Sequence, residues 1–371
     1  MPTRLGEYCV GGLRFINKYD ALVFATETNQ SVAWDFNDAV FSCFDWTVPV
    51  PESIDELYKR RAQQIRDKYD YVSLFFSGGV DSTNVLHAFI DNGIQLDEVV
   101  MFKPRCHVHN PLTTTPSDNM YSELEFAALP HLQKYLVGSG VKVRTIYFED
   151  ALDALLKNNT HASQFYKLNF LTPTALARVA MAVTDPDWKI LYDAGKNVAH
   201  IQGVDRPLLT KQGAGYNFAF HDYVATFVFE PAEVNETSER LKKHQHQEFF
   251  YWTPDLPKLA IKQAQIAKQV QLVNPEKPCN SEIALPCLYP PHVLSVRDLF
   301  YAGKPTWGTN GSHHKWIHSQ EITYAKGVFV DMLSHARATV SAKLTLPDPN
   351  IRAARPKVGS FKNFYSKEYR L

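Results

Sequence analysis

The hydrophobic pattern in the middle of the chain predicts an alternation of buried strands and helices. Residues 71–76, 98–102 and 141–147 are apolar runs too short for helices of their own, which suits strands covered on both faces. Apolar positions recur at helical spacing in 82–89, and another helix is predicted to end near Gly138. This strand-helix-strand order predicts an α/β fold built on a doubly wound parallel sheet.

Further elements are predicted on both sides of this region. Ser53 and Glu56 form a capping box for a helix through about Lys68. The run from Trp188 to Asp193 is interpreted as a fourth strand, and residues 208–210 and 216–220 as a hairpin whose loop carries Lys211. Residues 255–269 are predicted to form a helix.

The domain organisation follows from changes in pattern. Residues 12–15, 21–26 and 31–35 are interpreted as short strands, which predicts a small β-rich segment over 1–50. We expect the main nucleotide-binding domain over 51–270. A helical and loop extension that ends in a basic tail is expected over 271–371.

Chemistry is indicated most clearly by the turn that follows the first of the buried runs. Gly78 and Gly79 allow positive φ, so successive backbone N–H groups can converge on one anion. Asp81 and Ser82 then open a helix whose dipole favours negative charge at the same place. The turn is therefore predicted to bind phosphate.

The pattern Ser77-Gly78-Gly79-Val80-Asp81-Ser82 resembles the SGGxDS signature of the PP-loop ATP pyrophosphatase superfamily. The resemblance implies that the loop binds the β and γ phosphates of ATP, with Mg²⁺, and that ATP is cleaved between its α and β phosphates to adenylate a substrate oxygen. The nearest family is asparagine synthetase, through its synthetase domain. Its N-terminal glutaminase is expected to be absent here, because Cys9 is internal and only about seventy residues precede the loop.

Competing nucleotide-binding motifs are not matched. No Walker A lysine stands beside these glycines, and residues 213–218, GAGYNF, lack the third glycine of a dinucleotide fingerprint. A turn without any ligand is the structural alternative.

Side chains at other predicted strand ends complete the candidate site. Lys103 follows the second predicted strand, and Lys196 and Arg206 are placed where they could neutralise a leaving pyrophosphate. Asp205 could hold magnesium together with Asp81. Alternatively, Asp205 and Arg206 form a capped turn locked by Pro207. The predicted ATP-binding set is Ser77, Gly78, Gly79, Val80, Asp81, Ser82 and Lys103.

The favoured function is an ATP-dependent ligase or amidotransferase. It adenylates a carboxylate or carbonyl oxygen of a small molecule, after which ammonia or an amine displaces AMP. One alternative is amination or thiolation of a nucleobase in RNA, DNA or a free nucleotide, although thiolation usually recruits paired cysteines and none are paired in this sequence. A non-catalytic nucleotide-binding protein is the other alternative, against which Asp81 argues, because simple phosphate binding needs no carboxylate.

Composition excludes a strong general field for nucleic acid. The chain of 371 residues has 39 basic and 39 acidic residues. Its five cysteines give no disulfide framework, and no apolar run is long enough for a membrane span or signal peptide, so a cytoplasmic location without membrane contact is expected.

Two histidine-rich segments and the tail leave open interpretations. Cys106, His107 and His109 lack the partner cluster of a zinc site, and residues 307–318 could line a pocket or simply pack. The tail, 351–371, alternates basic and aromatic residues, which could pin it across the domain or stack on bases. Nucleic acid is thus a possible partner that is not favoured.

Overall fold

The computed structural model describes several separate stretches of the chain. The described residues are 6–16, 18–78, 80–103, 128–147, 150, 181, 184–203, 208–213, 215–222, 243–273 and 364–371. The loop residue Gly79, the pair Asp205 and Arg206, the two histidine-rich segments 106–109 and 313–318, and residues 351–363 of the tail lie outside them.

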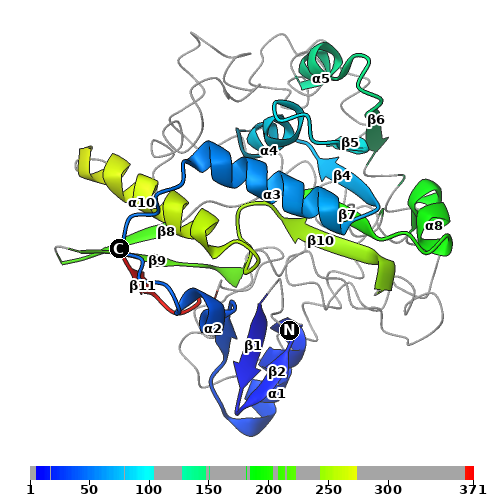
Figure 1. The fold of residues 1–371 in the computed structure, drawn as a ribbon. Coiled ribbons are helices and arrows are strands. Elements are labelled where there is room, and N and C mark those ends of the chain that lie inside the picture. Colours follow the sequence, from blue (N-terminus) through cyan, green and yellow to red (C-terminus); the bar gives the residue numbers. More distant parts are fainter. Residues whose placement is uncertain are drawn as a thin grey trace, which may run out of the picture.

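A five-stranded parallel sheet forms the centre of the molecule (Figure 1). Its strands are β4 (Tyr71–Phe75), β5 (Glu98–Lys103), β6 (Lys142–Tyr147), β7 (Val198–Gln202) and β10 (Gln245–Phe249). Their order is β10-β7-β4-β5-β6, and every neighbouring pair is parallel. The chain therefore moves one way from β4 to β6 and then returns to the other side of β4, which confirms the predicted doubly wound α/β fold.

Helices cover both faces of this sheet. Ser73 and His200 are register partners, and the His200 ring lies 4.1 Å from the Trp188 ring of α8 (Pro186–Asp193). Glu248 pairs with Ile201, one position along, and contacts Arg61 of α3 (Ile54–Lys68). Because successive strand residues point to opposite faces, α3 and α8 lie on opposite sides of the sheet. The helices α4 (Val80–Ile90) and α10 (Pro257–Val273) pack on the α3 side.

The helix α3 begins as its capping pattern predicts. Ser53 accepts a hydrogen bond from the Glu56 backbone N–H, and the Glu56 carboxylate accepts one from the Ser53 backbone N–H. Leu57, Ala62 and Ile65, the predicted apolar face, are buried. This helix anchors the α4 side of the sheet.

The fourth strand of the prediction is wrong. Residues Pro186–Asp193 form α8, in which Asp185 caps the helix by accepting from the Trp188 N–H and Pro186 occupies the first turn. Trp188 and Tyr192, four residues apart, are its buried positions. The strand that belongs in the sheet is β7, which starts at Val198.

The N-terminal segment is a small sheet packed with helices. Strands β1 (Glu7–Val10), β2 (Leu13–Phe15) and β3 (Ala33–Asp35) pair in the order β2-β1-β3, next to α1 (Lys18–Thr28) and the short α2 (Asp38–Phe41). Residues 21–26, predicted as a strand, lie within α1, where Ala21, Leu22 and Ala25 are buried at helical spacing. The segment thus combines three short strands with two helices. The division of the chain at residues 50 and 270 stays a prediction.

The predicted hairpin is confirmed and recruits the C-terminus. Strands β8 (Leu208–Gln212) and β9 (Gly215–Ala219) are antiparallel, and β11 (Tyr369–Arg370) pairs with β9. The Tyr369 ring stacks 4.5 Å from Trp46, and its hydroxyl donates to Asp38 at 2.7 Å. The described end of the tail is thus pinned across the domain by its aromatic residues.

One buried carboxylate joins these outer parts. Asp222 pairs with Lys18 at 2.7 Å, accepts from the Tyr8 hydroxyl at 2.8 Å and accepts from the Phe364 N–H at 3.0 Å. Burial lowers the pKa of Lys18, and burial together with Asp222 raises the pKa of Tyr8. The N-terminal sheet, the end of the hairpin and the tail therefore share one polar anchor within a single hydrophobic core. In the described part of the chain, no helix is both long and apolar enough to cross a membrane.

Candidate functional site

The candidate loop lies at β4, where the order in which the chain adds strands to the sheet reverses. It follows β4, whose two neighbours in the sheet are β5 and β7. The chain leaves β4 toward β5, whereas β7 lies on the opposite side of β4. Ligands of open α/β sheets bind outside the carboxyl ends of the strands at such a switch point.

The first residues of the loop fold back on the first turn of α4. The Ser77 N–H donates to the Ser82 hydroxyl oxygen at 3.2 Å, and the Thr83 hydroxyl donates to the Gly78 carbonyl at 3.4 Å. Gly78 has φ of +76°, and a Cβ added to it would lie 3.1 Å from the Cβ of Ala128. Both observations require glycine at this position.

A second glycine, which the sequence analysis did not single out, closes the site from β7. A Cβ added to Gly203 would lie 3.0 Å from the Asp81 carbonyl oxygen and 3.1 Å from the Ser82 nitrogen. The backbone at the end of β7 therefore contacts the N-terminus of α4 directly. The sequence signal was a glycine immediately after the buried run of β7.

Tyr251 holds the same turn from β10 and was also missed. Its hydroxyl donates to the Asp81 carbonyl at 2.7 Å and accepts from the Asn84 side-chain amide at 3.1 Å. Tyr58 of α3 packs edge-on against the Tyr251 ring, and burial raises the pKa of Tyr58. A tyrosine hydroxyl can donate one hydrogen bond and accept another, so Tyr251 joins the Asp81 carbonyl to Asn84. Its signal in the sequence was only an aromatic residue after a strand.

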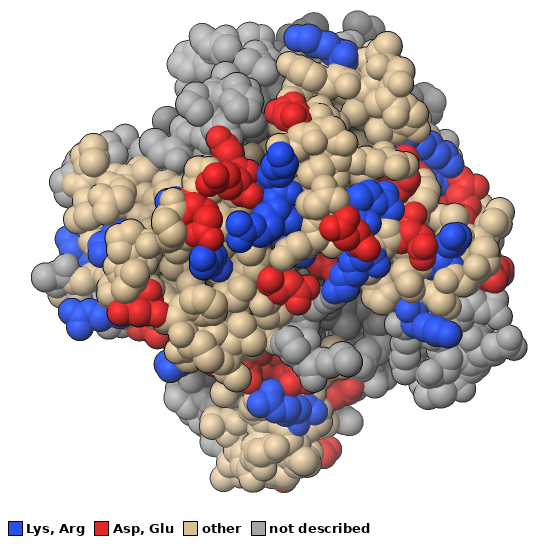
Figure 2. All heavy atoms as spheres, in the orientation of Figure 1, with Lys and Arg blue, Asp and Glu red and all other residues tan. Residues whose placement is uncertain are grey.

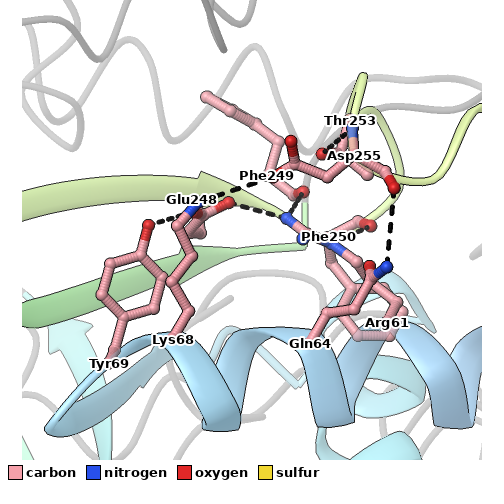
Figure 3. Close-up of polar contacts among 9 residues, drawn as sticks. All are labelled: Arg61, Gln64, Lys68, Tyr69, Glu248, Phe249, Phe250, Thr253 and Asp255. Atoms are coloured by element: carbon pink, nitrogen blue, oxygen red, sulfur yellow. Dashed lines mark hydrogen bonds and ion pairs between the residues drawn. The ribbon is translucent and has the colours of Figure 1, made fainter.

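The segment that carries Tyr251 is fixed by a buried ion pair, shown in Figure 3. Arg61 of α3 pairs with Glu248 at 2.7 Å and donates to the carbonyls of Phe249 and Phe250 at 2.9 and 3.3 Å. The Tyr69 hydroxyl donates to the other Glu248 oxygen. Because Arg61 satisfies two carbonyls just before Tyr251, the position of this tyrosine depends on α3.

The strand β7, next to β4 in the sheet, contains a buried histidine. His200 is fully buried, stacks on Phe75 and shares a hydrogen bond of 2.9 Å with the Tyr192 hydroxyl. Burial lowers the pKa of His200 to about 3. The ring is therefore neutral at pH 7 and serves packing rather than proton transfer.

The predicted site residues fall into three groups. Ser77, Gly78, Asp81 and Ser82 come together at the turn, and Lys103 is the last residue of β5, at the same edge of the sheet. Gly79, Asp205 and Arg206 lie outside the described residues. Since β7 ends at Gln202, Asp205 and Arg206 follow a strand end by three and four residues.

Lys196 is placed at the wrong edge by the prediction. It precedes β7 instead of following a strand, and Val198 pairs with Tyr71, the first residue of β4. Its ammonium group lies 3.7 Å from Asp70, just before β4. The loop follows the other end of β4, about 16 Å away at the usual rise per strand residue. The reason for assigning Lys196 to pyrophosphate is thus removed.

The turn fits a phosphate chain with magnesium. At Gly78 the turn packs closely on Ala128, and at Gly203 the end of β7 packs closely on the Asp81–Ser82 backbone, so a Cβ would crowd either contact. The helix α4 directs its first N–H groups toward the same edge. Asp81, in the first turn, supplies the hard oxygen ligand that Mg²⁺ prefers. Across the described ranges, no three His, Cys, Asp or Glu side chains converge to hold a metal on their own.

Comparisons with known proteins give no family for this chain. No protein-family model matches the sequence, and no curated protein matches it. A solved structure with some similarity is NAD⁺ synthetase from Burkholderia pseudomallei, at 14% identity and a TM-score of 0.24. The match covers 71% of this chain and 94% of that one. A TM-score this low establishes no shared function.

Proposed function

We propose that the chain is an ATP-dependent ligase of the PP-loop type that binds ATP and Mg²⁺ at residues 77–82 and adenylates a substrate oxygen. The substrate is a small molecule with a carboxylate or carbonyl group. A nitrogen nucleophile, either ammonia or an amine, then displaces AMP. The cytoplasmic location stays a prediction.

The observation that carries this proposal is the close contact between two strand ends at the switch point. The loop after β4 requires glycine at 78, and the backbone after β7 requires glycine at 203. Gly203 keeps side-chain atoms away from the N-terminus of α4, and Gly78 lets the loop lie close to Ala128. This arrangement suits a ligand with several negative charges better than it suits a turn that merely connects two elements.

The proposed chemistry divides into two balanced steps. In the first, a substrate oxygen attacks the α-phosphorus, the α–β bond breaks and pyrophosphate leaves. In the second, nitrogen attacks the activated carbon, the bond to the AMP oxygen breaks, and the nitrogen proton passes to solvent. Magnesium supplies charge neutralisation on the phosphate oxygens.

The roles proposed for the chain's own residues are binding and orientation. Backbone N–H groups of the loop and of α4 bind the β and γ phosphates, and Asp81 positions the metal. Lys103 and Arg206 neutralise charge near the α–β bond, and Asp205 is a second metal ligand. Arg206 and Asp205 are within reach, because three or four residues after β7 span at most about 14 Å. Lys196 is not included.

The described surface and tail do not favour nucleic acid as the substrate. On the face drawn in Figure 2, basic and acidic side chains are interspersed, without a large patch of one sign. Tyr369, which might otherwise stack on a base, is buried at 4% exposure. Phe364 packs against the core. A small-molecule acceptor is therefore the better proposal.

The test is incubation of the full chain with ATP, magnesium and a metabolite pool, with mass spectrometry of the products. We expect AMP and pyrophosphate in equal amounts and one metabolite changed in mass. Asp81→Asn should retain ATP binding but lose most turnover, whereas Lys196→Met should behave as wild type. ADP as the product, or an unchanged rate in Asp81→Asn, would contradict the proposal.

A further inference from the structure

Two imidazole rings face each other between α4 and α5 (Leu129–Leu136), away from the phosphate loop. His87 Nε2 lies 3.1 Å from His131 Nε2. His87 is buried at 7% exposure and His131 is half-buried. His87 is six residues beyond Asp81, or about 9 Å along the helix axis. The pair is therefore distinct from the proposed magnesium position.

The separation of the two nitrogens matches a shared metal ion. Zinc-nitrogen bonds are about 2.0–2.1 Å long, so two ligands of one tetrahedral ion lie about 3.3 Å apart. A separation of 3.1 Å corresponds to an angle of about 98° at the metal with such bonds. Binding would require a change of only a few tenths of an ångström.

The far side of the His87 ring is arranged as in metal-bound histidines. Nδ1 lies 3.1 Å from each carboxylate oxygen of Asp91. An Nδ1–H donated to Asp91 leaves the Nε2 lone pair of His87 facing His131, and metal-ligating histidines commonly have such a carboxylate partner. Asp91 follows the last residue of α4, where a negative charge is unfavourable to the helix dipole. Its contact with His87 offsets that cost.

The second ring, His131, is half-buried on α5. Its partial exposure leaves a path by which an ion could enter.

We propose that His87 and His131 together bind a divalent transition-metal ion of the zinc class, with Asp91 orienting His87. The described residues supply these two ligands, and water completes the coordination. Imidazole nitrogen suits zinc, copper and nickel, whereas magnesium prefers oxygen, so the two metal positions select different ions. In the metal-free protein, one ring donates Nε2–H to the other. When the metal binds, that ring takes its other tautomer, with the proton on Nδ1, so both rings stay neutral and both Nε2 lone pairs face the ion.

The consequence would be a link between α5 and the candidate active site. Ala128 immediately precedes α5 and lies next to Gly78, as its Cβ contact shows. An ion that ties α5 to α4 would fix this alanine beside the loop. Zinc should therefore order the loop without being needed for the chemistry.

The experiment uses the full chain after treatment with EDTA and removal of the chelator. Zinc is titrated by calorimetry, and hydrogen exchange is measured by mass spectrometry with and without zinc. In the wild type we expect zinc to increase protection of the peptides that span α4 and α5. His131→Gln should lose one equivalent of zinc, or bind it at least tenfold more weakly, and should lose the added protection.

His244→Gln is the matched control, since His244 is a partly buried histidine bonded to Asn197 elsewhere in the fold. The His244→Gln variant should keep both zinc binding and the added protection of α4 and α5. That result separates the His87–His131 pair from other histidines and cysteines of the chain. Circular dichroism checks folding, and His87→Gln provides a second variant.

Equal zinc stoichiometry and affinity in wild type and both pair variants would overturn the proposal. So would an absence of added protection in α4 and α5. Binding of ATP with magnesium alone is measured separately and should survive in His131→Gln.

Discussion

The two edges of the central sheet use charge in opposite ways. At the amino edge, charged side chains hold one another: Arg144 binds Glu98 and Asp185, and Arg66 pairs with Asp97 at 2.5 Å. At the carboxyl edge, the described contacts around α4 involve glycines, hydroxyls and backbone carbonyls instead.

The difference indicates which edge can receive a charged ligand. Each charge at the amino edge already has a partner of opposite sign, so this edge offers little to an anion, and removal of one partner should destabilise the fold. Backbone N–H groups at the start of a helix carry a partial positive charge that favours an anion. The comparison predicts that substitutions at the amino edge change stability alone, whereas those at the carboxyl edge change ATP binding.

The largest expected effect comes from the buried carboxylate of the amino edge. Glu98 is fully buried, pairs with Arg144 and accepts from Trp188 Nε1 at 2.7 Å. Glu98→Gln leaves the arginine partly uncompensated and should lower the free energy of unfolding by about 3 kcal/mol in urea denaturation. Asp187→Asn, which removes a half-exposed partner of Arg144, should cost less than about 1 kcal/mol. Equal costs in the two variants would remove the distinction.

His200 should make stability fall with acid. Its folded pKa of about 3 lies below the usual value of about 6.5, so between these values the unfolded chain binds a proton that the native chain does not. Its contribution is complete above pH 6.5 and declines as the pH falls, by up to about 1.4 kcal/mol per unit. Urea unfolding at several pH values should show a shallower slope in His200→Phe. If stability fell equally steeply with pH in the wild type and in His200→Phe, the buried ring would not be neutral as described.

At the carboxyl edge, Gly203→Ala should affect both properties. Its Cβ would push against the Asp81 carbonyl and the Ser82 nitrogen, which should cost about 1–3 kcal/mol of stability. Calorimetry should show ATP affinity reduced at least tenfold. Gly195→Ala is the control, because Gly195 has φ of +74° but open space around it. This control should lose about 1 kcal/mol of stability and no ATP affinity. Normal ATP affinity in Gly203→Ala would separate Gly203 from the site.

Tyr251→Phe removes one hydroxyl and keeps the ring. The Asp81 carbonyl loses its donor, so the first turn of α4 should be held less firmly, at a cost of about 1 kcal/mol. ATP affinity should fall about fivefold. Tyr58→Phe should leave ATP affinity unchanged, because phenylalanine keeps the ring contact with Tyr251 and the hydrogen bond that Tyr58 accepts from Gln263 is long, at 3.5 Å. If both variants bind ATP equally, Tyr251 has no positioning role.

The sequence predicted those strands and helices for which the hydrophobic pattern and the capping or turn residues indicate the same element. The runs of β4, β5 and β6, the capping box of α3 and the hairpin β8-β9 were all visible locally. The run 188–193 misled because a short apolar stretch fits either element, and the Asp185-Pro186 start that marks a helix was outweighed. β7 was hidden because its buried His200 and Gln202 are polar, and only tertiary partners such as Tyr192 and Gln247 explain their burial.

The candidate site was predictable only where it is continuous in sequence. Ser77, Gly78, Asp81 and Ser82 follow one another and carry their own signature. Gly203 and Tyr251 reach the turn from strands more than a hundred residues away, so their roles depend on the strand order β10-β7-β4. Strand order is a property of packing that no local pattern records.

Lys196 gives the smallest expected effect and the sharpest test of the two edges. Its half-exposed ammonium group is 3.7 Å from Asp70, a surface pair whose loss should cost less than about 0.5 kcal/mol. Because Lys196 lies before β7 and the loop follows β4, Lys196→Met should leave both ATP affinity and AMP formation unchanged. The comparison partner is Arg206→Met, since Arg206 follows β7 at the carboxyl edge and should lose turnover far more than ATP affinity. If Lys196→Met were to lose turnover instead, charge at the amino edge would contribute to catalysis, and the division of the sheet into a stabilising edge and a binding edge would be wrong.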